Sequence, residues 1–121
     1  MICDLEAGIG AIVRSDQADV VLAVAEPTVK SIEVARRATE IAGERSPVVV
    51  IANRVREEED VDVIRSVLGE QELIVVPEEP GIAAADREGA APIDFAPESV
   101  GVRALVDLGE RLAERAQRAA A

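Results

Sequence analysis

Polar residues of types that suit nucleotide or metal chemistry follow four apolar, strand-like runs of this chain. The runs and their polar endings are Ile2-Cys3 before Asp4, Val20–Ala25 before Glu26-Pro27, Val48–Ala52 before Asn53, and Leu73–Val76 before Pro77-Glu78-Glu79. In an open parallel α/β sheet, ligands bind outside the carboxyl ends of the strands. The four endings therefore predict a binding crevice along one edge of a sheet.

The residues that would hold a nucleotide's phosphates are missing from the sequence. No stretch has the form GxxxxGK[ST], and Lys30 is the only lysine. Gly8 and Gly10 form a lone GxG, which is a weak phosphate signature and also fits a simple turn. The sequence thus has polar residues that suit a nucleotide site but lacks the loop that would bind the phosphates.

Stretches with helical periodicity separate the strand-like runs, as in successive βαβ units. The last three runs begin 28 and 25 residues apart, which leaves room for helical crossovers. The runs starting at 20 and 48 are continuously apolar, as strands buried on both faces are. We expect one α/β domain over residues 1–121, with a parallel sheet of about four strands sandwiched by helices.

Capping residues and glycines predict where the helices begin and end. We expect one helix capped by Thr28 and ended near Gly43, one capped by Asp60 and ended by Gly69, one from Glu98 to Arg118, and a loop between Gly89 and Pro97. The first strand has only three residues before Asp4, so we expect a further segment upstream.

Composition excludes several classes of function. With 24 acidic and 13 basic residues the net charge is -11, which disfavours nucleic acid and anionic membranes. No apolar run approaches the roughly 18 residues of a membrane span. The start of the chain lacks a signal peptide and Cys3 stands alone, so we expect a cytoplasmic protein. Without histidine, Ser-His and Cys-His catalysis and imidazole ligands are excluded.

An ordered set of short motifs resembles the later part of the deviant-Walker P-loop ATPases, the MinD/ParA/nitrogenase-iron-protein superclass. The motifs are Asp4-Leu5-Glu6-Ala7-Gly8-Ile9, Val24-Ala25-Glu26-Pro27, Ser31, Ala52-Asn53-Arg54-Val55 and Val76-Pro77-Glu78-Glu79. The first is most similar to the Walker B and switch II segment of the CooC-type carbon monoxide dehydrogenase maturation factors. The resemblance implies a partial P-loop NTPase domain of the SIMIBI type.

The resemblance also implies roles for single residues. Asp4 matches the aspartate that helps to hold Mg²⁺ through water, and carboxylate oxygen suits this hard cation. Gly8 matches the switch glycine that responds to the γ-phosphate. Asn53 matches the asparagine that recognises adenine, because an amide can both donate and accept. Pro77–Glu79 matches the segment on the other side of the base.

Each of these roles has a structural alternative. Asp4 could cap the turn after a strand, Gly8 could serve a turn, and Asn53 could satisfy loop backbone groups. The sequence also departs from the family pattern, since the P-loop would lie upstream of Met1 and the Cys-x-Cys motif of the maturation factors is absent. We therefore expect Mg²⁺ and ATP to bind this chain alone at about millimolar affinity or weaker, roughly -4 kcal/mol.

Three functions remain open from the sequence. The first is the carboxyl-terminal part of a MinD/CooC-like ATPase, which needs a P-loop-bearing partner segment. The second is a non-catalytic interaction module that uses its exposed sheet edge or switch region to bind a partner. Separately, the missing upstream half should leave an edge strand or an apolar face uncovered, which favours a homodimer. The third, a receiver-like signalling domain, lacks the required lysine near the last strand, where Pro77-Glu78-Glu79 stands instead.

Overall fold

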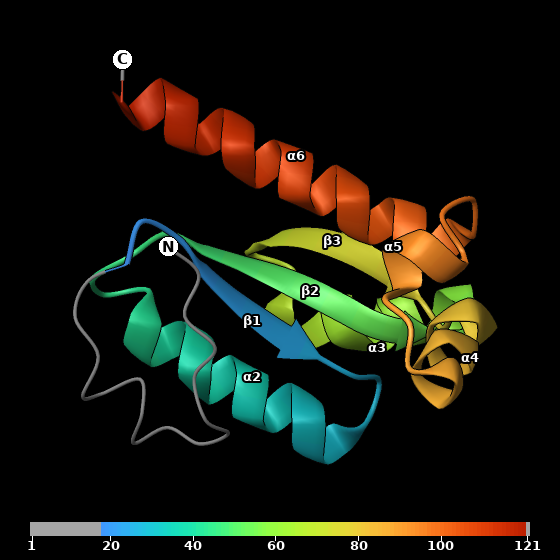
Figure 1. The fold of residues 1–121 in the computed structure, drawn as a ribbon. Helices are drawn as coiled ribbons and strands as arrows, with labels where there is room; N and C mark the ends of the chain where they lie inside the picture. Colours follow the sequence, from blue (N-terminus) through green and yellow to red (C-terminus); the bar gives the residue numbers. More distant parts are fainter. Residues whose placement is uncertain (1–17, 121) are drawn as a thin grey trace. The chain divides into compact units, whose positions relative to one another are not determined.

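The computed structural model describes residues 18–120 of the chain. The elements are β1 (Val21–Ala25), α2 (Val29–Ala42), β2 (Val48–Val55), α3 (Glu58–Leu68), β3 (Glu72–Pro77), α4 (Pro80–Glu88), α5 (Pro92–Phe95) and α6 (Val100–Ala120) (Figure 1). The chain forms two compact units, which divide between Ile74 and Val75. We describe each unit by itself.

The strands form a sheet with the order β1-β2-β3. β1 and β2 run parallel, in a register that pairs Val21 with Val48 and Ala25 with Ala52. The α/β class and the parallel sheet flanked by helices are thus confirmed. The described residues contain three strands, and the fourth expected strand, Ile2-Cys3, lies outside them.

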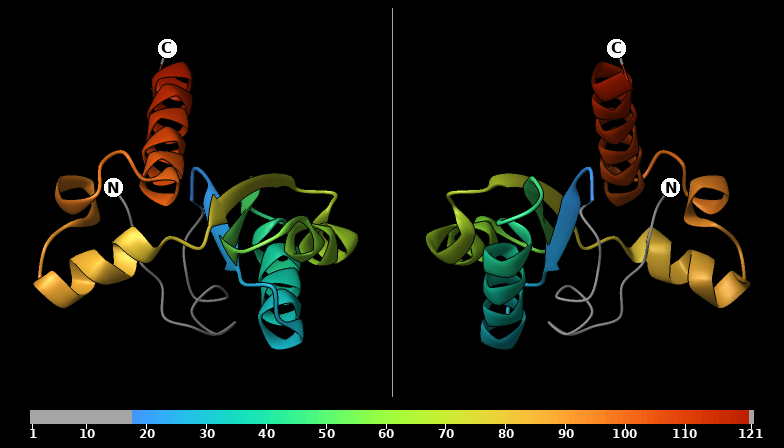
Figure 2. Two further views of the ribbon diagram at one scale, coloured as in Figure 1. Left: turned by 90° about the vertical axis from the view of Figure 1, so that its right-hand side faces the viewer. Right: turned by 90° about the vertical axis from the view of Figure 1, so that its left-hand side faces the viewer.

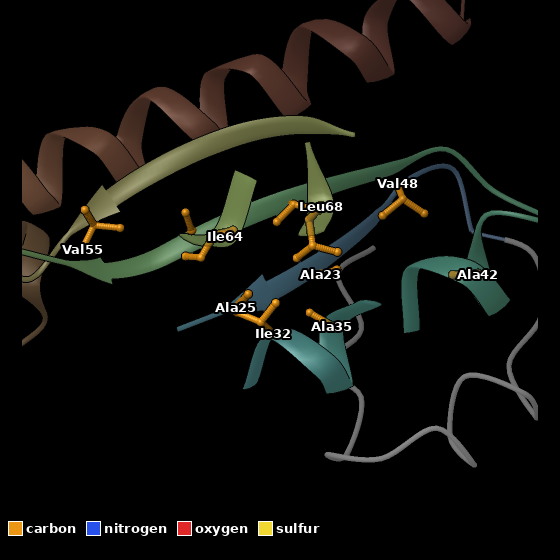
Figure 3. Close-up of a cluster of buried hydrophobic side chains, with 11 residues drawn as sticks. Ala23, Ala25, Ile32, Ala35, Ala42, Val48, Val55, Ile64 and Leu68 are labelled. Carbon is orange, nitrogen blue, oxygen red and sulfur yellow. The ribbon is translucent and has the colours of Figure 1, made fainter. Parts of the chain in front are cut away.

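One face of β1 and β2 carries the hydrophobic core of the first unit. Helices α2 and α3 lie on the same side of these strands (Figure 2) and contact each other. The core side chains are aliphatic: Ala23, Ala25, Ile32, Ala35, Ala42, Val48, Val50, Ala52, Val55, Ile64 and Leu68 (Figure 3). The helices contribute Ile32 and Ala35 from α2, and Ile64 and Leu68 from α3, at the i, i+3 and i, i+4 spacings of an amphipathic helix.

β2 is buried on both faces along its first five residues. Val49 and Ile51 point away from the core cluster, yet each is only 4% exposed. This burial explains why the run from Val48 to Ala52 is continuously apolar rather than alternating.

Local hydrogen bonds define the ends of α2 as the sequence predicts. Thr28 Oγ1 accepts from the backbone N–H of Ser31 at 3.2 Å, which caps the start of the helix. The N–H of Gly43 donates to Thr39 O at 2.8 Å after the last helical residue. The expected helix from Thr28 to Gly43 is therefore confirmed.

The predicted start of α3 at Asp60 is wrong, because the helix begins earlier. Glu57 is the N-cap residue and Asp60 lies in the first turn. The Asp60 carboxylate reaches back and accepts from the N–H of Arg56 at 2.9 Å and of Glu57 at 3.4 Å. A carboxylate three residues inside the helix thus satisfies amides that precede it, as in a capping box.

The second unit contains helices where the sequence analysis expected only a loop or assigned no structure. α4 has Pro80 at its first turn and ends at Gly89, which adopts a left-handed conformation with φ 69°. The short α5 occupies part of the expected loop from Gly89 to Pro97. α4 contacts both α5 and the long helix α6, and α6 begins two residues later than predicted.

Candidate functional site

The carboxyl ends of β1 and β2 lie side by side in the first unit. Ala25 and Ala52 form the last pair in the register of these strands, so Glu26 and Asn53 follow directly at the same edge. Asn53 is half-buried and is the first polar residue of β2. Two of the predicted polar strand endings are therefore together at one edge, as the sequence analysis expected.

The start of α2 anchors Glu26. Its backbone N–H donates to Ser31 Oγ at 2.9 Å, and the N–H of Ser31 in turn donates to Thr28 Oγ1. Ser31 therefore accepts a hydrogen bond from Glu26 with its hydroxyl and donates one to Thr28 with its backbone N–H. These bonds fix the backbone from which the Glu26 side chain projects.

The side chain of Glu26 forms an ion pair with Arg54 beyond the end of β1. Arg54 Nη1 donates to Glu26 Oε1 at 3.2 Å, and the two side chains are 60% and 41% exposed. An ion pair this exposed contributes no more than about 1 kcal/mol to stability. Its main effect is to connect the end of β1 to the end of β2.

The backbone of Arg54 is in the left-handed region, with φ 58°. Among the described residues other than glycine, it is the one with a positive φ. For an L-residue without a short polar side chain this conformation costs about 1–2 kcal/mol. Such outliers are often found at functional sites.

The positive φ of Arg54 shifts the alternation of side chains along β2. Val48, Val50 and Ala52 belong to the core cluster, and so does Val55, although a regular strand would place residue 54 on that face. One extra residue is thus accommodated before Val55, as at a β-bulge. The shift keeps Arg54 exposed and returns Val55 to the core.

The predicted segment Pro77–Glu79 lies in the second unit, where the carboxylate of Glu79 connects two helix starts. Glu79 Oε2 accepts from the N–H of Gly81 in α4 at 3.0 Å, and Oε1 accepts from the N–H of Gly101 in α6 at 2.9 Å. These two bonds, from Gly101 first and Gly81 second, with a smaller contribution from Ser99, lower the pKa of Glu79 below its ordinary 4.5.

Several predicted site residues remain predictions. Asp4 and Gly8 lie outside the described residues. Asn53 belongs to the first unit and Pro77–Glu79 to the second, so their joint role at a base is also still a prediction. Residues 18–120 contain no group of three or more His, Cys, Asp or Glu side chains that could hold a metal ion.

The Glu26–Arg54 pair is the feature of this edge that sequence reasoning missed. Both residues lie inside the motifs quoted for the resemblance, but neither was given a role. No signal for the pair is present in the sequence, because the run from Val48 to Ala52 is apolar at every position and shows no alternation that Arg54 could interrupt.

Together the described residues at this edge offer an amide, a guanidinium and a carboxylate. They can donate to and accept from a planar heterocycle, but they form no nucleophile and base pair.

None of the helices in the part of the chain that the structure describes is long and apolar enough to cross a membrane.

The fold is MinD/ParA-like and related to that of the P-loop NTPases. The solved structure of the MinD cell division protein from Aquifex aeolicus is similar to this chain, with a TM-score of 0.68 and 28% sequence identity. The match covers 86% of this chain and 46% of that one, so the chain spans less than half the length of the MinD structure. No family model matches the chain, and a search of curated proteins found no match.

Proposed function

We propose that this chain is the base-recognising part of a MinD-like ATPase of the deviant-Walker class, of the metallocentre-maturation or partitioning type. The observation that carries the proposal is the similarity to MinD over 86% of the chain, together with Asn53 at the carboxyl edge of the sheet. Asn53 would read the adenine edge, and Pro77, Glu78 and Glu79 would line the base on its other side.

The residues present fit a nucleotide base better than its phosphates. The half-buried amide of Asn53 can donate to and accept from adenine. The sequence contains no GxxxxGK[ST] loop, so a P-loop-bearing segment would supply the phosphate contacts. Asp4 would hold Mg²⁺ through water and Gly8 would respond to the γ-phosphate, and both roles come from the resemblance to the CooC-type proteins.

A calorimetric titration of the 121-residue chain with Mg-ATP tests the proposal. We expect an affinity of about millimolar or weaker, roughly -4 kcal/mol, that falls further in Asn53→Ala. Gln117→Ala is the matched control, because it removes an exposed amide from α6. Equal binding of Mg-GTP and Mg-ATP, or equal binding by wild type and Asn53→Ala, would contradict base recognition by Asn53.

Tight binding would also change the proposal. Micromolar affinity that is lost in Asn53→Ala would mean that the strand-end site works without a P-loop. The chain would then be a nucleotide sensor rather than part of an ATPase. If the wild type binds Mg-ATP only weakly, adding a P-loop-bearing chain should raise its affinity for Mg-ATP. The same addition should not raise the affinity of Asn53→Ala.

One observation favours the second candidate, a non-catalytic interaction module that binds through an exposed edge, and it also favours the homodimer. Val24, the fourth of the five residues of β1, is 56% exposed, and β1 is an edge strand among the described strands. Exposed apolar residues on an edge strand favour pairing with another chain. Sedimentation of wild type and Val24→Lys over a range of concentrations tests this. A monomer at every concentration in both would exclude the homodimer.

A further inference from the structure

The left-handed backbone of Arg54 lies between two residues of the core. Ala52 and Val55 both belong to the core cluster although they are three residues apart, and Arg54 adopts a φ of 58° between them. Asn53 lies between the fully buried Ala52 and Arg54, and it is half-buried itself. The backbone that carries Asn53 is thus anchored in the core on both sides, and the conformation of Arg54 makes the second anchor, Val55, possible.

The ion pair with Glu26 links Arg54 in β2 to the residue that follows β1. Arg54 Nη1 lies 3.2 Å from Glu26 Oε1, and Glu26 is anchored through its N–H to Ser31 at the start of α2. A continuous set of contacts therefore runs from the cap of α2 to the bulge in β2. Glycine would adopt this backbone without strain, so an arginine here suggests that its side chain has a function.

We infer that Arg54 is a positioning residue: its left-handed backbone and its ion pair with Glu26 fix the end of β2 that carries Asn53, so that the Asn53 amide keeps the orientation that reads a nucleotide base. The inference rests on the proposed function of Asn53. It adds two residues, Glu26 and Arg54, to the recognition site. Neither needs to touch the ligand, since both act through the backbone that carries Asn53.

The chain offers an unusually direct probe, because Asn53 is its only asparagine. Selective ¹⁵N-asparagine labelling gives one backbone amide and one side-chain NH₂ group in the NMR spectrum. The side-chain relaxation reports how well the Asn53 amide is held, without any ligand. Its chemical shift on addition of millimolar Mg-ATP reports contact with the nucleotide.

Four variants of the full chain separate the contributions of the ion pair and of the Arg54 backbone to the order of the Asn53 side chain. Glu26→Gln removes the charge of the partner, Arg54→Gly removes both the side chain and the backbone strain, and Arg54→Lys keeps a cation that can reach Glu26. Arg36→Gln is the matched control, because Arg36 forms exposed ion pairs with Glu33 and Glu40 on α2. Circular dichroism verifies that each variant remains folded.

We expect Glu26→Gln and Arg54→Gly to release the Asn53 side chain, with its order parameter falling below about 0.6. The Mg-ATP shift at Asn53 should at least halve in the same two variants. Arg54→Lys should retain most of both signals, and Arg36→Gln all of them. An Asn53 side chain with the same order in wild type, Glu26→Gln and Arg54→Gly would overturn the inference.

The two readouts distinguish this inference from the proposed function. If Mg-ATP leaves Asn53 of the wild type unchanged while the variants still release its side chain, the nucleotide role is wrong and the positioning role stands. If Mg-ATP shifts Asn53 equally in all variants, the nucleotide role stands and the positioning role is wrong.

Discussion

The carboxylate of Glu79 accepts a hydrogen bond from the backbone N–H of Gly101, 22 residues further along the chain, at 2.9 Å. The same carboxylate accepts from Gly81, so one side chain caps the starts of α4 and α6. Negative charge at a helix start is stabilised by the helix dipole, and here two helices share it.

The stability of the second unit should depend on pH through Glu79. Hydrogen bonds from Gly101 and Gly81 hold the pKa of folded Glu79 below the ordinary 4.5. A lowered pKa gives stability that is fully present above the unfolded value and is lost as the pH falls through the folded value. We expect the ¹³C signal of the Glu79 carboxyl to titrate with a midpoint below 4.5, and Glu79→Gln to be less sensitive to acid in this range. A midpoint at or above 4.5 would contradict this.

Gly101→Ala should destabilise the protein although alanine favours helices. A Cβ at this position would overlap Cβ and Cγ of Glu79, so the capping side chain would have to move. We expect a loss of about 1–3 kcal/mol in urea unfolding, as for other overpacked sites. Gly109→Ala on the same helix is the control, because a Cβ there meets nothing within 4 Å. It should stabilise α6 by about 1 kcal/mol, and effects of the same sign in both variants would contradict the role of Glu79.

Truncation of Ile64 should strongly destabilise the first unit. Ile64 on α3 is fully buried in the core cluster, and its neighbour Val63 is 48% exposed. Removing a buried isoleucine side chain leaves a cavity and costs about 2–5 kcal/mol. Val63→Ala should change the stability by no more than about 0.5 kcal/mol. Similar losses for the two variants, measured by urea unfolding, would show that α3 does not pack on the sheet as described.

Thr39→Val should stabilise the protein. Thr39 on α2 is 7% exposed, and its buried hydroxyl finds no hydrogen-bond partner in the part of the chain that the structure describes. Valine has nearly the same shape and no polar atom to bury, so we expect a gain of about 1 kcal/mol. Thr28→Val makes the same change at the cap of α2, where it removes a hydrogen bond to Ser31. That variant should lose about 1 kcal/mol, and its thermal unfolding should shift in the opposite direction.

The parallel strands and the first helix could be predicted because their signals are local. The continuous apolar run from Val48 to Ala52 indicates a strand buried on both faces, and Thr28 and Gly43 mark the ends of α2. The start of α3 was placed three residues too late, because Asp60 satisfies amides of residues that precede it. The sequence alone does not distinguish an acidic residue at the N-cap from an acidic residue in the first turn of the helix.

The second unit was harder to predict because its contacts join distant residues. Pro80 and Gly89 do indicate the limits of α4, but the bond from Gly101 to Glu79 depends on how α4 and α6 pack. In the candidate site, the polar strand endings could be recognised from the sequence. The positive φ of Arg54 could not, since an arginine gives no local indication of a left-handed backbone.

The position of Glu79 also affects which ligands the second unit can attract. The starts of two helices would ordinarily form a favourable place for a phosphate or another anion. Here the protein's own carboxylate takes the hydrogen bonds of Gly81 and Gly101 at those starts. Glu79 thus serves as a built-in counter-ion, and a nucleotide's phosphates would have to compete with a tethered carboxylate there. The capping role of Glu79 is therefore compatible with the base recognition proposed above and not with phosphate binding at these helix starts.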